Sequence, residues 1–162
     1  MWSSDRLPRR AVLLGGLTLL AGCGFSPVYG PGGAAAPLLG TTAVEAPATE
    51  AGYRLRLRLI DRLGPSEAPT YLLSVDLDIR DAAVGVTSEQ ETTRYNLPGA
   101  ATYRLTDVAT GIGVASGTVD GFTSYSATGT SVSTFAAAED ARQRLAVVLA
   151  DRILDRLAAA LT

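Results

Sequence analysis

The 162-residue chain has no histidine, no lysine and a single cysteine, Cys23. Histidine is the commonest general base and the commonest metal ligand in proteins. Its absence argues against hydrolytic and metal-dependent catalysis. The candidate nucleophiles Ser124, Ser126 and Ser131 therefore have neither a histidine nor a lysine to activate them. We expect no enzyme activity, no bound metal and no cofactor.

The chain also lacks an excess of positive charge. It has 14 basic residues, all arginine, against 16 acidic ones, for a formal net charge of −2. Nucleic-acid binding needs a basic face, so we expect no nucleic-acid partner. Arginine suits phosphate recognition because the planar guanidinium makes two-point contacts. A chain rich in Ala, Gly and Arg is, however, also typical of GC-rich coding sequence.

Residues 1–22 have the pattern of a secretory signal peptide. Arg6, Arg9 and Arg10 precede an apolar run that starts at Ala11. That run has about ten residues, whereas a membrane span needs roughly 20. The run ends at residues 20–23, Leu-Ala-Gly-Cys, which resemble a bacterial lipobox. The resemblance implies cleavage before Cys23, a diacylglycerol thioether on its thiol and acylation of the new amine.

Two features of this region concern the destination of the protein. Arg9 and Arg10 resemble a twin-arginine export signal, but Pro8 stands where Ser or Thr is usual. General secretion and twin-arginine export therefore both stay open. The residue after Cys23 is Gly24 rather than Asp. By resemblance to lipoprotein sorting signals, this implies passage to the outer membrane.

Residues 23–40 are rich in Gly, Pro and Ala, which predicts a lipidated flexible tether. Three apolar side chains within it, Phe25, Val28 and Tyr29, are candidates for docking on a partner or on the lipid surface. Residues 41–162 then predict one folded domain.

The first half of this domain predicts a strand, a helix and a second strand. A short strand is expected at 41–45, followed by a helix cap at Thr49. Residues 53–63 fit two patterns. Alternating Leu and Arg favour a strand, whereas a wide apolar arc and good helix formers favour a helix. We choose the helix, with its stop at Gly64. Residues 70–80 alternate cleanly as a strand.

The second half predicts two more strands and a long helix. Strand patterns at 84–97 and 101–108 are interrupted by Pro98 and Gly99. After a turn at 107–111, residues 112–125 return as a strand with a kink near Gly117. A polar loop is expected at 124–134. An apolar stripe at three- and four-residue steps then predicts a helix over 135–161.

These elements predict an α+β fold. We expect a two-layer sandwich in which a sheet of about four strands is covered by two helices, in the order β-α-β-β-β-α. The alternation in 70–80 places Asp76 and Asp78 on the solvent face of their strand. That placement favours a hydrated surface over a pair of catalytic acids.

Several local strings, in this order, resemble the LptE family of lipopolysaccharide-assembly lipoproteins in its alphaproteobacterial form. The strings are residues 20–30 at the lipobox, 103–107 with Thr110 and Gly111 at the turn, Ser124-Tyr125, and Phe135-Ala136 with 138–142 at the last helix. Together they extend over nearly the whole mature chain. Their order and spacing are more specific than any string alone.

The resemblance implies an outer-membrane lipoprotein that lies as a plug inside a large β-barrel partner, LptD. The pair inserts lipopolysaccharide into the outer leaflet, and the lipoprotein assists folding of the barrel. Arg94 and Arg104 are candidates for contact with the lipid A phosphates of lipopolysaccharide, and the alternative is an ordinary solvated strand face. The alternatives are a lipoprotein subunit of an ABC-type lipid transport system, a periplasmic hydrolase and a structural surface antigen.

Overall fold

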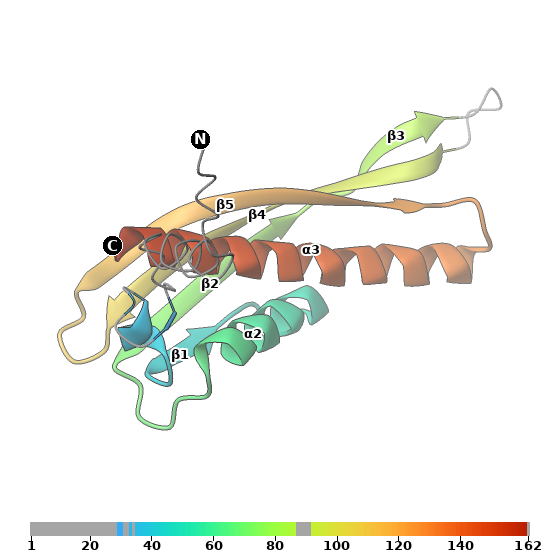
Figure 1. The fold of residues 1–162 in the computed structure, drawn as a ribbon. Coiled ribbons are helices and arrows are strands. Elements are labelled where there is room, and N and C mark those ends of the chain that lie inside the picture. The colour runs from blue at the N-terminus through green and yellow to red at the C-terminus, as the bar shows by residue number, and fades with distance from the viewer. Residues whose placement is uncertain (1–28, 31–32, 34, 87–91, 162) are drawn as a thin grey trace, which may run out of the picture.

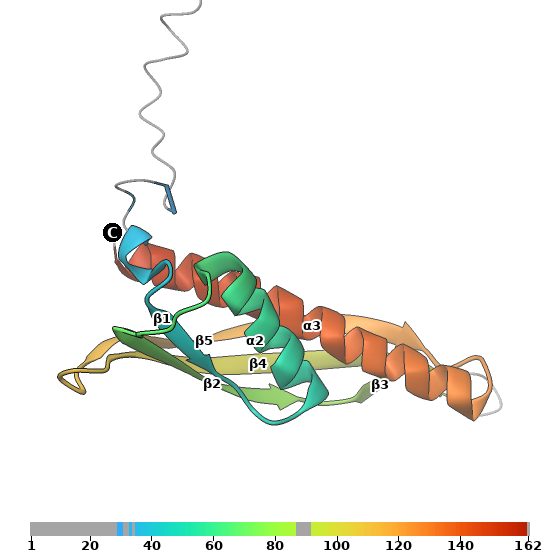
Figure 2. The same cartoon turned by 90° about the horizontal axis from the view of Figure 1, so that it is seen from below.

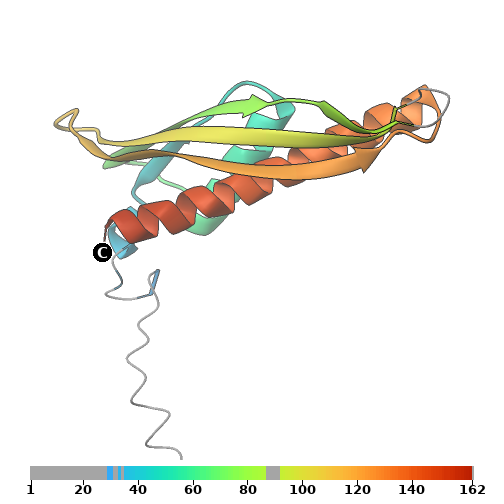
Figure 3. The same cartoon turned by 90° about the horizontal axis from the view of Figure 1, so that it is seen from above.

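The chain folds into two layers, a twisted sheet and a pair of helices. The computed structural model describes residues 29–30, 33, 35–86 and 92–161. Both long helices lie on the same face of the sheet, and no described helix covers the other face (Figures 1, 2 and 3). The predicted α+β two-layer class is confirmed. In chain order the elements are η1 (Ala36–Leu38), β1 (Thr42–Glu45), α2 (Glu50–Leu63), β2 (Tyr71–Ile79), β3 (Ala82–Val86), β4 (Thr92–Asp107), β5 (Gly113–Ser126) and α3 (Ser131–Ala160).

The sheet has five strands, one more than predicted. β1 pairs in parallel with β2, while β2 and β3 both pair antiparallel with the same edge of β4. β5 pairs with the opposite edge of β4 along nearly its whole length. β3 therefore continues the line of β2 beyond a break at residues 80–81. The order is β-α-β-β-β-β-α, with four strand positions across the sheet.

Pro98 accounts for this break. The predicted interruption of β4 at Pro98 and Gly99 was wrong, since β4 runs through both residues. The Arg80 N–H donates to the Pro98 carbonyl at 3.0 Å. In an antiparallel ladder the N–H and C=O of one residue face the same neighbour, and proline has no N–H to donate. The N–H that Pro98 lacks would face the point where β2 ends. The line of β2 and β3 therefore breaks there, while β4 continues.

The ambiguous segment 53–63 is helical, as we chose. α2 begins behind Thr49, whose Oγ1 accepts the Gly52 N–H at 3.1 Å, and its C-cap is Gly64 at φ 82°. Leu55, Leu59 and Leu63 are fully buried at four-residue steps. A strand with the predicted alternation would bury Leu57, but this side chain is 39% exposed.

α3 begins at Ser131, four residues before the predicted start, and β5 extends to Ser126. The polar loop predicted at 124–134 therefore shrinks to four residues. Its Ser and Thr residues lie at the start of the helix, where the Thr130 Oγ1 accepts the Ser133 N–H at 3.3 Å as the N-cap. A capped first turn tolerates such polar residues, which is why their composition alone resembled a loop.

Glycines on the covered face of the sheet let α3 pack closely. A Cβ on Gly99 would lie 2.8 Å from the Leu145 Cδ2, and one on Gly121 would lie 3.5 Å from the Leu149 Cδ2. The predicted kink near Gly117 is absent. The register of β5 shifts instead at Val114, because Leu105 pairs with Ala115 whereas Thr106 pairs with Gly113. The core between the layers is mainly leucine from α2, α3 and the strands.

Candidate functional site

The face of the sheet that carries no helix is the candidate interaction surface, and we call it the open face. Residues directly opposite each other in register point to the same face. The pairing of β2, β4 and β5 therefore groups one set of side chains there: Leu72, Ser74, Asp76, Asp78, Arg94, Asn96, Pro98, Ala100, Thr102, Arg104, Ser116, Thr118, Asp120, Phe122, Ser124 and Ser126. Most of them are polar, so this face favours a hydrated environment over a second packed layer.

Arg104 lies in a polar hollow on this face. Its direct partners in register are Ser74 on β2 and Ser116 on β5. The hollow has a volume of about 350 Å³, and Thr102 and Thr118 are joined across it by a hydroxyl contact of 3.1 Å. A guanidinium surrounded by hydroxyl groups can hold a phosphate through charge-assisted hydrogen bonds. The exposed carboxylate of Asp76 in the same hollow limits how much negative charge the site accepts.

Arg94 lies on the same face near the other end of β4, opposite Ser126. Both arginines are exposed. Ten residues of extended strand separate them, a span of about 33 Å. The fold therefore places the two predicted lipopolysaccharide contacts on one face but does not bring them together. Each can meet only a different part of a ligand, or a different ligand.

Between these two arginines the open face includes an exposed apolar side chain. Phe122 is 72% exposed and lies opposite Pro98. Phe122 and Pro98 line a hollow with a volume of about 480 Å³. At this hollow Arg80 forms an ion pair with Asp78. This pairing neutralises both side chains. The centre of the face thus presents the exposed ring of Phe122 beside this ion pair and the exposed carboxylate of Asp120.

The three candidate nucleophiles do not form a group. Ser124 and Ser126 lie on the open face opposite Asn96 and Arg94, whereas Ser131 is the first residue of α3. Within the described residues, no set of three His, Cys, Asp or Glu side chains gathers as metal ligands.

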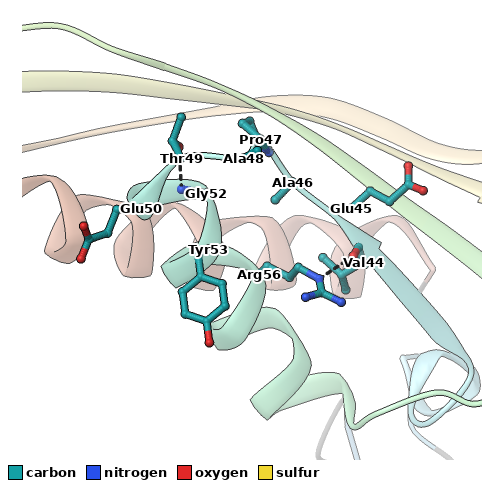
Figure 4. Close-up of a pocket in the computed structure, with 10 residues that line it drawn as sticks. All are labelled: Val44, Glu45, Ala46, Pro47, Ala48, Thr49, Glu50, Gly52, Tyr53 and Arg56. Atoms are coloured by element: carbon teal, nitrogen blue, oxygen red, sulfur yellow. Dashed lines mark hydrogen bonds between the residues drawn. The ribbon is translucent and has the colours of Figure 1, made fainter.

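A groove lies between the edge strand β1 and the start of α2 (Figure 4). It has a volume of about 860 Å³, and the loop of residues 46–48 forms one wall. Arg56 reaches across from α2, and its Nε donates to the Val44 carbonyl at 3.0 Å. That contact covers a carbonyl on the free edge of β1, a common way to protect an edge strand. Tyr53, 56% exposed, is the aromatic side chain of this groove.

A polar cluster joins three elements near the break between β2 and β3. Asp81 accepts a hydrogen bond from the Arg142 Nη2 of α3 at 2.8 Å and one from the Tyr125 hydroxyl of β5 at 3.2 Å. The Tyr125 ring stacks on Tyr95 with centroids 5.1 Å apart. Burial and the nearby Asp81 raise the pKa of Tyr125. No sequence pattern predicts this cluster, because only the strand register brings these residues together.

Part of the predicted tether packs against the domain. Ala35 and Leu38 are buried, so the packed chain begins a few residues before Thr41. The Tyr29 hydroxyl donates to the Leu154 carbonyl of α3 at 2.6 Å. Burial and the nearby Asp155 raise the pKa of Tyr29. Of the three predicted docking side chains, Tyr29 therefore contacts α3 of its own chain. Phe25, Val28, Cys23 and the signal peptide lie outside the described residues.

Comparison with protein families gives a match to the model described as "LptE: Lipopolysaccharide-assembly" over residues 39–157. This range contains every described strand and the whole of α2, together with most of α3. No curated protein matches the chain.

Three solved structures have a similar fold. A lipoprotein from Caulobacter crescentus CB15 is 25% identical, with a TM-score of 0.65 over 80% of this chain and 98% of its own. Rare lipoprotein B from Shewanella oneidensis is 14% identical, with a TM-score of 0.57 over 74% and 92% of the two chains. A minor lipoprotein from Acinetobacter baumannii is 19% identical, with a TM-score of 0.55 over 74% and 91%.

None of the helices in the described ranges has the length and hydrophobicity needed to cross a bilayer. The longest, α3, carries charged side chains along one side and packs its apolar side on the sheet.

Proposed function

Because the chain belongs to the LptE family of lipopolysaccharide-assembly proteins, we propose that it is the lipoprotein plug of an LptD-like β-barrel in the outer membrane. In this role it assists assembly of the barrel and insertion of lipopolysaccharide into the outer leaflet. The family is non-enzymatic, so the function consists of binding and positioning.

The family match over residues 39–157 carries this proposal. The open face supports it physically. Wide membrane barrels have polar, hydrated interiors, and a plug must therefore present polar side chains to the wall. A sheet face of Ser, Thr, Asp and Arg side chains meets this requirement without burying unpaired charge.

The anchor completes the proposal. Cleavage before Cys23 and its acylation would hold the protein at the membrane through more than one acyl chain. A single chain binds only marginally, whereas two chains give stable attachment.

Depletion of the protein in its own bacterium tests the role. We expect surface lipopolysaccharide to fall together with the amount of correctly folded barrel partner. Unchanged levels of both would refute the proposal. Co-purification from the same cells separates it from the ABC-type alternative, since recovery of an inner-membrane permease without an outer-membrane barrel would favour the transport system.

The two arginines of the open face give a finer prediction. Because Arg94 and Arg104 are about 33 Å apart on β4, we expect their effects on lipopolysaccharide binding to be independent. Charge reversal of Arg104 should weaken binding more, since Arg104 lies among hydroxyl groups in a hollow. Binding of the purified protein would be measured for R94E, R104E and the double variant. Unchanged binding of the double variant would exclude both arginines as contacts.

A further inference from the structure

Three segments with few charged side chains meet at one end of the molecule, and we call it the anchor end. The Thr70 N–H donates to the Thr41 carbonyl at 2.8 Å, and the Val108 N–H donates to the Thr70 carbonyl at 2.9 Å. Residues 33–44 and 108–119 contain no charged side chain, and 63–73 contain only Glu67. Charged side chains close to these segments include Asp107 at the end of β4, and Arg62 and Asp155 beside Tyr29.

The β4–β5 hairpin forms the tip of this end (Figures 1 and 3). Its aliphatic side chains point into solvent: Val108 is 53% exposed, Ile112 66% and Val114 40%. The turn is well braced, since the Asp107 carboxylate accepts hydrogen bonds from the Thr110 N–H and hydroxyl, and Gly111 adopts φ 70°. Three exposed aliphatic side chains within seven residues of a braced turn form a candidate apolar contact surface.

The covalent chain limits where the lipid can lie. Tyr29 is held to the Leu154 carbonyl near the C-terminal end of α3. Tyr29 follows Cys23 by six positions in the sequence, a stretch that can extend over about 21 Å at most. The C-terminal end of α3 lies on the same side of the molecule as the hairpin (Figure 1). A lipid on Cys23 therefore keeps the anchor end, rather than the β3 end, next to the bilayer.

We propose that the hairpin tip formed by Val108, Ile112 and Val114 inserts into the bilayer leaflet that holds the Cys23 lipid. The inference rests on acylation of Cys23, which is part of the proposed function. The occupant is the boundary between headgroups and acyl chains, where exposed aliphatic side chains are buried at little polar cost.

The hairpin tip has no basic side chain, which decides which property of the bilayer matters. Basic patches bind anionic headgroups, and their binding falls with salt. The hairpin tip has no basic residue, so its contact must depend on burial of apolar surface. Insertion should therefore be independent of anionic lipid and of salt. A second insertion point would also fix the tilt of the domain, which a flexible tether alone cannot do.

The test uses the full-length mature lipoprotein, with its acylation first checked by mass spectrometry. Since Cys23 is the only cysteine and its thiol would be blocked by the thioether, an introduced cysteine is the only site for a thiol-reactive probe. An environment-sensitive fluorophore would be placed at A109C in the tip, or at T128C between β5 and α3 as the control. The protein would be reconstituted in phosphatidylethanolamine vesicles with and without phosphatidylglycerol, containing lipids that carry a quencher on the acyl chain.

We expect a blue-shifted emission and quenching at least about twofold stronger at position 109 than at 128, unchanged by salt or phosphatidylglycerol. Ile112→Asp should abolish the difference. Phe135→Asp should leave it unchanged, because Phe135 is similarly exposed, at 70%, but lies at the start of α3. Equal, water-like emission at both sites in the acylated protein would overturn this inference and leave the proposed function intact, as would a shift that requires anionic lipid. A missing lipid on Cys23 would overturn this inference and the anchor in the proposed function, whereas the plug role is tested separately by depletion.

Discussion

At the scale of single residues, Asp107 links the β4–β5 turn to pH. Its carboxylate accepts the Thr110 N–H at 2.8 Å and the Thr110 hydroxyl at 2.9 Å. These hydrogen bonds favour the charged form and hold the pKa of Asp107 below its ordinary value of 3.8. A depressed folded-state pKa contributes stability above the unfolded-state value, and that contribution is lost as the pH falls through the folded-state pKa.

Asp107→Asn tests this linkage, because the amide oxygen can still accept from Thr110 but no longer titrates. We expect the wild-type protein to be more stable than the variant at neutral pH, with the gap closing below about pH 4 as the carboxylate is protonated. Thermal unfolding of both proteins from neutral pH to pH 3 would measure this. A gap that stays constant over that range would contradict the assignment.

Other residues show how local the sequence signals are. Thr49 was predicted as a cap and is one, because capping needs only the next three residues. Arg56 could not be predicted to cover Val44, since that contact joins two elements 12 residues apart. The same holds for Asp81, whose partners lie on β5 and α3.

At the scale of elements, α3 packs along the length of the sheet. It has 30 residues, a length of about 45 Å, which matches the long β4–β5 ladder. Leu145, Leu149 and Ile153 are fully buried along one stripe. Gly121 and Gly99 lie beneath this stripe, so that the helix approaches the strands closely.

Neighbouring residues of α3 therefore should differ sharply in their contribution to stability. Leu149→Ala should lower the free energy of unfolding by about 2–5 kcal/mol, because the glycine-lined surface beneath it cannot collapse into the cavity. Val148→Ala, at a side chain 37% exposed, is the matched control and should cost less than about 1 kcal/mol. Urea unfolding of the purified domain would give both values. Similar losses for the two variants would mean that α3 packs in another orientation.

At the scale of the whole molecule, two surfaces have different characters. The open face is polar along most of its length, whereas the hairpin tip at the anchor end presents exposed aliphatic side chains. The first suits the wall of a hydrated barrel and the second suits a lipid boundary. A protein held by an anchor at one end and by a barrel along one face needs both properties.

Cys23→Ser separates the two attachments. We expect the variant to leave the membrane fraction while keeping its fold, because residues between Leu38 and Leu157 form the buried core of the described domain. We also expect the barrel partner still to co-purify with it, since the open face is unchanged. Fractionation, circular dichroism and affinity purification from the same cells would measure the three effects. Loss of the barrel from a folded variant would make the lipid, rather than the protein surface, the main attachment.

The sequence alone determined the features that depend on neighbouring residues. The α+β class and the hydrated placement of Asp76 and Asp78 follow from periodicity. The pattern of 53–63 fits both a helix and a strand, and only the structure decides for the helix. The family resemblance likewise followed from ordered local strings. Tertiary structure decided what depends on pairing between distant segments: the break of β2 opposite Pro98, the distance between Arg94 and Arg104, and the meeting of three segments with few charges at the anchor end. Strand register and helix packing set these relations, and neither is encoded within one local window.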